Sequence, residues 1–286
     1  MKIEKDKLLK HVKNFKNQYI VLLLLVLTNI PLFIDLVADW INDDNYSHGF
    51  FIIPISIYLY YSKRDTLQFP SEKSQSGLYL FILGLLFIIL GTAASEFFTT
   101  RVGFVLSLTG FTLYTIGYPN FRKVWFSFFF LLFMIPIPSI IYYAATIPMQ
   151  LFATKVTVGL LKVIGVPVAR NGNIIALPNY MLEVVEACSG LRSLMTLLAL
   201  GALYSYTKMP GKILPIILFC ATVPIAIATN IFRIFSTALG AYAVSKEIAE
   251  DFLHELSGIL VFVTALIMML ILGAILQWIR NRFISQ

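Results

Sequence analysis

The sequence predicts an all-α, polytopic membrane protein with about eight membrane-spanning helices, an outer interfacial helix and a small β-hairpin element. Of its 286 residues, 58% are hydrophobic and only 13% are charged. Soluble domains contain roughly 45–50% apolar and about 25% charged residues, so this chain has too few polar side chains to cover a water-facing surface. Several uninterrupted apolar runs also reach the length of about 20 residues that one helical crossing requires.

Short loops with Lys and Arg separate the predicted spans. The first span follows a basic N-terminal segment that lacks a small-residue cleavage pattern, so we expect a retained span rather than a signal peptide. The second predicted span is short and partly polar. The eight predicted spans are residues 19–40, 48–62, 77–95, 102–118, 122–138, 189–207, 213–240 and 254–279.

The charge distribution predicts an orientation in the inner (cytoplasmic) membrane with both termini in the cytoplasm. This orientation places most Lys and Arg residues inside, as the positive-inside rule requires. The net charge of +7 is explained by these loops, so we expect no nucleic-acid partner. Cys188 and Cys220 provide neither a disulfide framework nor metal-ligand spacing.

Residues 1–286 are predicted to form a single membrane domain with an outer-face insertion at about 139–187. Residues 140–165 contain Lys155 and Lys162 among apolar residues, which favours a helix at the outer interface. The pair Asn171-Gly172 lies between β-branched runs and predicts a tight hairpin turn. Exposed strand backbone cannot lie in lipid, so we expect this element in water or at the interface.

Three reactive or ionisable residues lie at the ends of predicted spans. Cys188 begins the sixth span, Arg233 lies in the outer part of the seventh, and His254 begins the eighth. In the predicted orientation all three lie at one depth, near the outer boundary. Ionisable residues in a membrane are costly and mark functional sites, so we consider these three as one candidate site.

The three residue types suit acyl transfer. A cysteine with a lowered pKa is a competent nucleophile, a histidine can move the proton, and an arginine can stabilise an oxyanion. Asn230 lies one helical turn before Arg233 and could orient it. Arg192, one turn after Cys188, could favour the thiolate or bind an acidic substrate group.

Each of these residues also has a structural explanation when taken alone. A cysteine near a span is often a small buried hydrophobe, a histidine can cap a helix, and an arginine can extend to the headgroups. Cys220 lies within a span without charged neighbours, and we interpret it as a packing residue. A metal site from His48, Cys188 and His254 lacks ligand spacing, so we expect no metal and no cofactor.

The motifs around these residues resemble the exosortase/archaeosortase family of membrane cysteine transpeptidases. The resemblance covers roughly residues 45–260, and its motifs occur in the family's order. The matching segments are Asn45-Tyr-Ser-His-Gly49, Val166-Pro-Val with Arg170-Asn-Gly-Asn173, Glu186-Ala-Cys-Ser-Gly-Leu-Arg-Ser193, Asn230-Ile-Phe-Arg233, and His254 with Gly258.

The resemblance implies roles for these residues and a substrate class. Cys188 is the implied nucleophile, Arg233 the electrostatic stabiliser and His254 the proton-transfer partner. The substrate would be an exported protein with a C-terminal sorting tail, cleaved near the outer boundary through a thioester. The acyl group would pass to an envelope polymer, a lipid acceptor or water. The expected substrate-binding or supporting residues are His48, Glu186, Ser189, Arg192 and Asn230.

Three alternatives remain open from the sequence. An intramembrane endopeptidase would hydrolyse the same bond without transfer. A multi-span transporter or channel would have interrupted helices in both halves and charged groups near the midplane. A scaffold for envelope-polymer assembly would have no peptidase activity and would not need Cys188.

Overall fold

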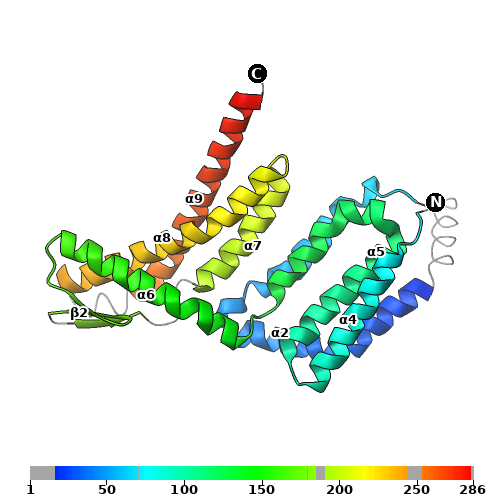
Figure 1. Ribbon diagram of the computed structural model, residues 1–286, viewed down its shortest axis with the longest axis horizontal. Helices are drawn as coiled ribbons and strands as arrows, with labels where there is room; N and C mark the ends of the chain where they lie inside the picture. The colour runs from blue at the N-terminus through cyan, green and yellow to red at the C-terminus, as the bar shows by residue number, and fades with distance from the viewer. Residues whose placement is uncertain (1–16, 70, 179, 185–190, 244–252, 285–286) are drawn as a thin grey trace. The chain divides into compact units, whose positions relative to one another are not determined.

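The protein is mostly helical and divides into two compact units, Met1–Pro136 and Ile137–Gln286 (Figure 1). The computed structural model describes residues 17–69, 71–178, 180–184, 191–243 and 253–284, with side chains described for all of these except 191–193, 253–257 and 283–284. The predicted single-domain organisation stays a prediction. The second unit begins close to the start of the predicted insertion at about 139.

The apolar helices confirm a multi-pass membrane protein, whereas the predicted eight spans are not confirmed. Among the described residues, five helices are long and apolar enough to cross a membrane, or six when one bent helix pair is counted as a span. The predicted span 48–62 corresponds to α3 (Gly49–Ser62), which has only 14 residues. The five qualifying segments are Gln75–Ala93, Phe97–Met134, Ser139–Val163, Ile213–Ala243 and Gly258–Arg282.

The first predicted span, 19–40, is broken rather than straight. Helix Asn17–Thr28 and helix α2 (Ile30–Asn42) meet at an angle of 53°. Pro31 lies at the start of α2, where a proline restricts the preceding backbone and lacks an amide hydrogen. Asn29 at the break donates a side-chain hydrogen bond to the Leu25 carbonyl at 2.8 Å.

Helices α4 (Gln75–Ala93) and α5 (Phe97–Phe130) pack backbone to backbone through glycines. The glycines recur every seven residues on both helices, at 77, 84 and 91 and at 103, 110 and 117. A Cβ at Gly84 would lie 2.8 Å from the Gly103 carbonyl oxygen, and one at Gly103 would lie 2.7 Å from the Ile88 nitrogen. Small residues permit this approach, which is how helices associate in lipid.

Helix α5 consists of two helical arms that meet at Gly117. Gly117 has φ 74° and ψ 161°, outside the helical region. The contacts of both arms show that the chain turns back there. The Arg101 guanidinium lies 2.7 Å from the Asp39 carboxylate, and the indole nitrogen of the adjacent Trp40 donates to the Met134 carbonyl at 3.0 Å. Residues 101 and 134 therefore lie at the same end of the first unit. The single candidate segment Phe97–Met134 thus contains the predicted span 102–118 and most of the predicted span 122–138.

In the second unit, α6 (Ser139–Val163) precedes a three-stranded antiparallel sheet. Its strands are β1 (Ala169–Asn171), β2 (Ile174–Leu177) and β3 (Tyr180–Glu183), in the order β1-β2-β3. The predicted hairpin is confirmed, with Gly172 at φ 61° in the two-residue turn between β1 and β2. The predicted interfacial helix is not confirmed, because α6 itself is long and apolar enough to cross a membrane.

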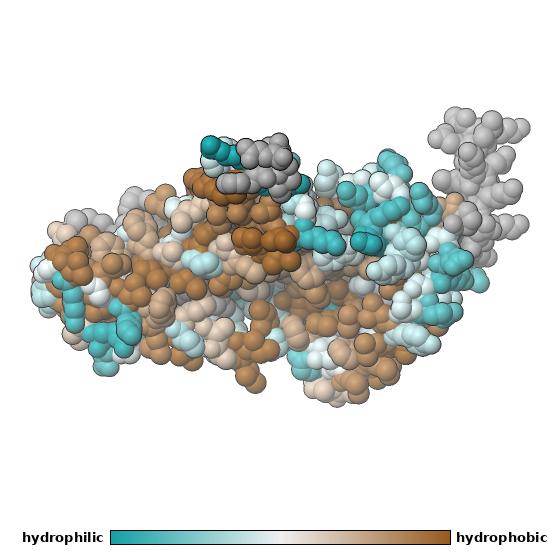
Figure 2. Space-filling model, turned by 45° about the horizontal axis from the view of Figure 1, so that its top comes forward, coloured by the Kyte–Doolittle hydropathy of each residue, from teal (hydrophilic) through white to brown (hydrophobic). Residues whose placement is uncertain are grey.

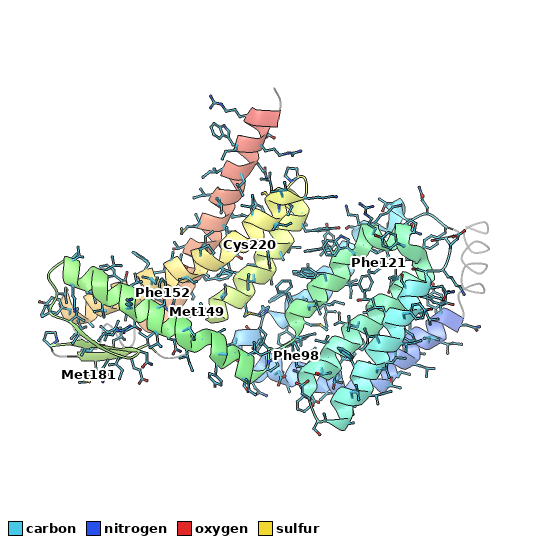
Figure 3. All side chains as sticks on the ribbon, in the orientation of Figure 1. Phe98, Phe121, Met149, Phe152, Met181 and Cys220 are labelled. Carbon is cyan, nitrogen blue, oxygen red and sulfur yellow. The ribbon has the colours of Figure 1, made fainter. Side chains whose placement is uncertain are left out.

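Helices α7 (Leu191–Lys208), α8 (Ile213–Ala243) and α9 (Leu253–Ile284) complete the second unit. Their buried side chains form one hydrophobic cluster with α6, and its most buried members include Leu197, Leu218 and Met269. The outward faces of the helices remain apolar, as expected for surfaces in lipid, and hydrophobic side chains cover much of the face shown in Figure 2. Cys220 lies exposed on α8 (Figure 3), so its interpretation as a packing residue is wrong.

Candidate active site

The predicted nucleophile motif lies at the gap between strand β3 and helix α7. Glu186, Cys188 and Ser189 fall outside the described residues, and their predicted roles stay predictions. The flanking segments are described, however, and Val184 is only four residues before Cys188. A chain extends by at most about 3.6 Å per residue, so a segment of four residues spans at most about 14 Å.

The sheet that precedes Cys188 packs directly against the part of α8 that follows Arg233. Leu182 and Val184 are 9% and 1% exposed and share a hydrophobic cluster with Ile234 and Ala238 of α8. Their alternation with exposed residues is what a strand with one buried face requires. The packing therefore joins the strand before the predicted nucleophile to the helix turn next to the predicted stabiliser.

Gly201 of α7, Thr222 of α8 and Met269 of α9 form one packing layer, the Gly201 layer, which fixes the relative directions of the three helices. A Cβ at Gly201 of α7 would overlap the Thr222 side chain of α8 and would lie 3.5 Å from the Met269 sulfur of α9. Farther along, the Gln277 amide of α9 donates to the Lys208 carbonyl of α7 at 3.2 Å. Helices α7 and α9 are therefore parallel, and α8 runs in the opposite direction between them.

Three of the predicted site residues lie on the same side of this Gly201 layer. Arg192 is nine residues before it in α7, Arg233 eleven residues after it in α8, and His254 fifteen residues before it in α9. At 1.5 Å per residue these separations are about 14, 16 and 22 Å along the helices. Their backbone positions thus occupy one end of the three-helix group, while the side chains of Arg192 and His254 lie outside the described set.

Asn230 and Arg233 occupy neighbouring turns of α8. Asn230 is only 3% exposed, and its side-chain oxygen has no hydrogen-bond partner among the described residues. Arg233 is half-buried. A buried amide oxygen without a partner is costly and is suited to accept a hydrogen bond, so Asn230 can act as an acceptor at this end of the unit.

His48 lies in the first unit, where it joins two segments. It is 8% exposed, and its Nε2 lies 3.2 Å from the Phe133 carbonyl oxygen. Because a carbonyl only accepts, Nε2 carries the hydrogen in this bond. The following residue, Gly49, is in contact with the Trp40 indole, where a Cβ would overlap the ring. His48 thus has a structural role in holding residue 133 beside α3.

Sequence reasoning missed an ion pair in which the arginine is buried and the aspartate is partly exposed. Arg101 is 4% exposed and lies 2.7 Å from Asp39, whose side chain is 43% exposed. The Arg101 guanidinium also lies over the Phe97 ring, with its carbon 5.6 Å from the ring centre. The signal was present, since an arginine near the start of an apolar helix needs an anionic partner to be buried, and Asp39 ends the first apolar run.

A cavity of about 540 Å³ lies within the first unit and bears on the transporter alternative. Its walls come from the N-terminal helices, α3 and α5, and include Phe104, Phe111 and Phe128. Among the described residues that line it there is no Asp, Glu, Lys, Arg or His. The charged lining that a transporter predicts is therefore not found in this cavity.

Within the described part of the chain, no three His, Cys, Asp or Glu residues form a group that could hold a metal ion.

Comparison with known proteins agrees with the motif-based assignment. A family model described as transmembrane exosortase matches residues 40–271. No curated protein and no solved structure matches the chain. The matched segment covers most of the sequence and includes the motifs of Cys188, Arg233 and His254, which confirms the predicted resemblance. The chain belongs to the transmembrane exosortase family.

Proposed function

We propose that this protein is a membrane-embedded cysteine transpeptidase or protease that cleaves C-terminal sorting tails of exported proteins. The family assignment implies this activity. The observation that carries the proposal for this chain is the common end of the α7–α9 group, where Arg192, Arg233 and His254 are on one side of the Gly201 layer. Val184, four residues before Cys188, packs in one cluster with Ile234 of α8, and this contact supports the assignment of Cys188 to the same site.

The proposed reaction begins with a Cys188 thiolate and a His254 imidazolium. The sulfur attacks the carbonyl carbon of the scissile peptide bond, and Arg233 stabilises the resulting oxyanion. The carbon–nitrogen bond then breaks, the imidazolium gives its proton to the leaving amine, and the tail departs. The products of this half-reaction are a thioester on Cys188 and a neutral His254.

The second half-reaction regenerates the enzyme. An amine or hydroxyl of an envelope polymer or lipid, or a water molecule, attacks the thioester carbonyl and gives its proton to His254. The carbon–sulfur bond breaks and returns the thiolate. Transfer and hydrolysis differ only in the attacking group, so access of acceptor and water to the thioester decides between transpeptidase and protease.

The proposed location of the reaction is the outer face of the cytoplasmic membrane. This location rests on the excess of Lys and Arg in the segments that we assign to the cytoplasm. A tail with a membrane helix would leave the bilayer at that boundary. The buried Asn230 oxygen is proposed to accept a hydrogen bond from the Arg233 guanidinium and so fix its direction.

The test compares host cells that carry wild-type protein, Cys188→Ala or Cys220→Ala. Intact masses of envelope proteins are measured in each strain, with insertion of each variant verified by immunoblotting. We expect exported proteins to retain their tails in Cys188→Ala cells and to lose them in Cys220→Ala cells. Identical masses in all three strains would overturn the proposal and would favour the transporter or scaffold alternatives.

A further inference from the structure

The hydrogen-bonding direction of each sheet residue follows from the first turn. Asn171 and Ile174 close the two-residue turn, and such a closing pair exchanges backbone hydrogen bonds. Ile174 therefore directs its backbone groups toward β1, and the neighbouring Ile175 directs its groups toward β3. Because Ile175 is opposite Leu182, Leu182 directs its backbone N–H and C=O groups toward β2.

Backbone hydrogen-bonding directions alternate along β3, so two of its residues direct their N–H and C=O groups away from β2. Leu182 and Tyr180 direct their backbone groups toward β2, so Met181 and Glu183 direct theirs to the other edge. An independent contact supports this parity, because the Val184 nitrogen donates to the Asn173 carbonyl at 3.0 Å, again on the β2 side. No described backbone group pairs with the outward edge of β3.

The two edges of the sheet are not equivalent. On β1, only Arg170 directs its backbone groups outward, and its guanidinium donates to the Leu151 carbonyl of α6 at 3.3 Å. On β3, Met181 and Glu183 are both exposed, and Met181 is 74% exposed. Figure 3 labels Met181 on the sheet. An unpaired strand edge of this kind is a template for another extended chain.

The position of β3 in the chain gives this edge its significance. Glu183 is five residues before Cys188, a length of chain that spans at most about 18 Å. The buried face of the strand packs on α8 next to Arg233 through Ile234. A peptide paired with β3 would thus extend toward the site of acyl transfer.

We propose that the free edge of β3 binds the substrate in an extended conformation, as an added strand. The occupant is the segment of the exported protein that precedes its membrane-spanning tail. The backbone N–H and C=O groups of Met181 and Glu183 form the ladder, which positions the scissile bond relative to Cys188. This inference rests on the proposed function, because it describes how the same substrate is held.

The first test removes one outward amide hydrogen. Met181→Pro deletes an N–H that points away from β2, a position at which an edge strand tolerates proline. Met181→Ala keeps the N–H and controls for the side chain. Arg170→Pro deletes the outward N–H of β1 and is compared with Arg170→Ala, because both variants lose the guanidinium bond to the Leu151 carbonyl. The probes are the exported proteins that retain their tails in Cys188→Ala cells, followed by pulse-chase. We expect Met181→Pro to slow tail removal by about five- to tenfold, Met181→Ala to process tails at a rate close to wild type, and Arg170→Pro to match Arg170→Ala.

A second measurement does not require proline to be tolerated. A photo-crosslinking phenylalanine derivative replaces Met181, or Ala169 of β1 as a control, in the full-length Cys188→Ala chain. We expect crosslinks from position 181 to the tail-bearing proteins and none from position 169. Crosslinks only to a second copy of this chain, or equal crosslinks from both positions, would overturn the proposal.

The outcomes separate this proposal from the proposed function. If tails accumulate in Cys188→Ala cells while Met181→Pro cells process them at the wild-type rate, strand addition at β3 is wrong and the enzyme proposal stands. If tails never accumulate in Cys188→Ala cells, the enzyme proposal fails and the strand-addition proposal fails with it.

Discussion

Close packing of α4 on α5 leads to a quantitative prediction for Gly84→Ala. A Cβ at this position would lie 2.5 Å from the Ser107 hydroxyl oxygen and 2.8 Å from the Gly103 carbonyl oxygen. The second atom belongs to the backbone, so the two helices must separate to accept the methyl group. Such overpacking costs about 1–3 kcal/mol, against a gain of about 0.5–1 kcal/mol from replacing a helical glycine.

The expected net loss is about 1–2 kcal/mol, which lowers Tm by about 2–8 °C for a protein of this size class. Gly159→Ala in α6 is the matched control, because a Cβ at Gly159 meets no atom within 4 Å. We expect this control to keep or slightly raise Tm. Thermal unfolding in detergent, followed by tryptophan fluorescence, measures both. A Gly84→Ala protein that melts at or above the wild-type temperature would refute the close-packing argument.

Three further predictions concern the capping of α5 and the proposed site. The Glu96 carboxylate accepts hydrogen bonds from the Thr99 and Phe98 nitrogens, and the Thr99 bonds chiefly lower its pKa. Glu96→Gln keeps an acceptor but loses the negative charge at the helix N-terminus, so it should cost about 0.3–1 kcal/mol at neutral pH. Because the pKa is lowered on folding, this difference should shrink as pH falls through the folded-state pKa, and melting curves at pH 7 and pH 3 would show it. Arg233→Lys should insert normally yet lose most tail removal, since an ammonium lacks the planar set of donors; a wild-type rate would exclude Arg233 from the mechanism. A membrane-impermeant thiol reagent added outside should label Cys188 but not Cys220, and labelling of Cys188 only from the cytoplasmic side would overturn the orientation.

Composition predicted the membrane class because burial in lipid acts on every residue of a span. The number of spans was harder to predict, since it depends on single residues that interrupt apolar runs. Pro31 breaks the first run, and Gly117 turns one long helix back on itself. Hydropathy averages over such positions and does not identify them.

The outer insertion shows the same difference between local and averaged signals. The turn at Gly172 was predictable because it depends on two adjacent residues. Lys155 and Lys162 favoured an interfacial helix, yet both are exposed on a helix that is otherwise apolar enough to span a membrane. Two lysines that extend toward headgroups are compatible with either arrangement.

The site residues were predictable to the extent that their chemistry is rare in an apolar chain. Arg233 and His254 were identified in this way, and their backbone positions lie on one side of the Gly201 layer. Arg101 was missed because its partner, Asp39, is 62 residues away in the sequence. The need of Arg101 for an anionic partner could be read from the sequence, but which carboxylate meets it depends on how the helices pack, and no local pattern encodes that.

The central claim is that tail removal proceeds through a thioester on Cys188. The most direct measurement uses purified protein in lipid nanodiscs and a tail-bearing protein isolated from Cys188→Ala cells, with reaction products followed by intact mass. We expect the wild-type chain to acquire the mass of the truncated substrate through a hydroxylamine-sensitive bond, and Cys188→Ala to leave the tail uncut. Cleavage by Cys188→Ala at the wild-type rate would contradict the account.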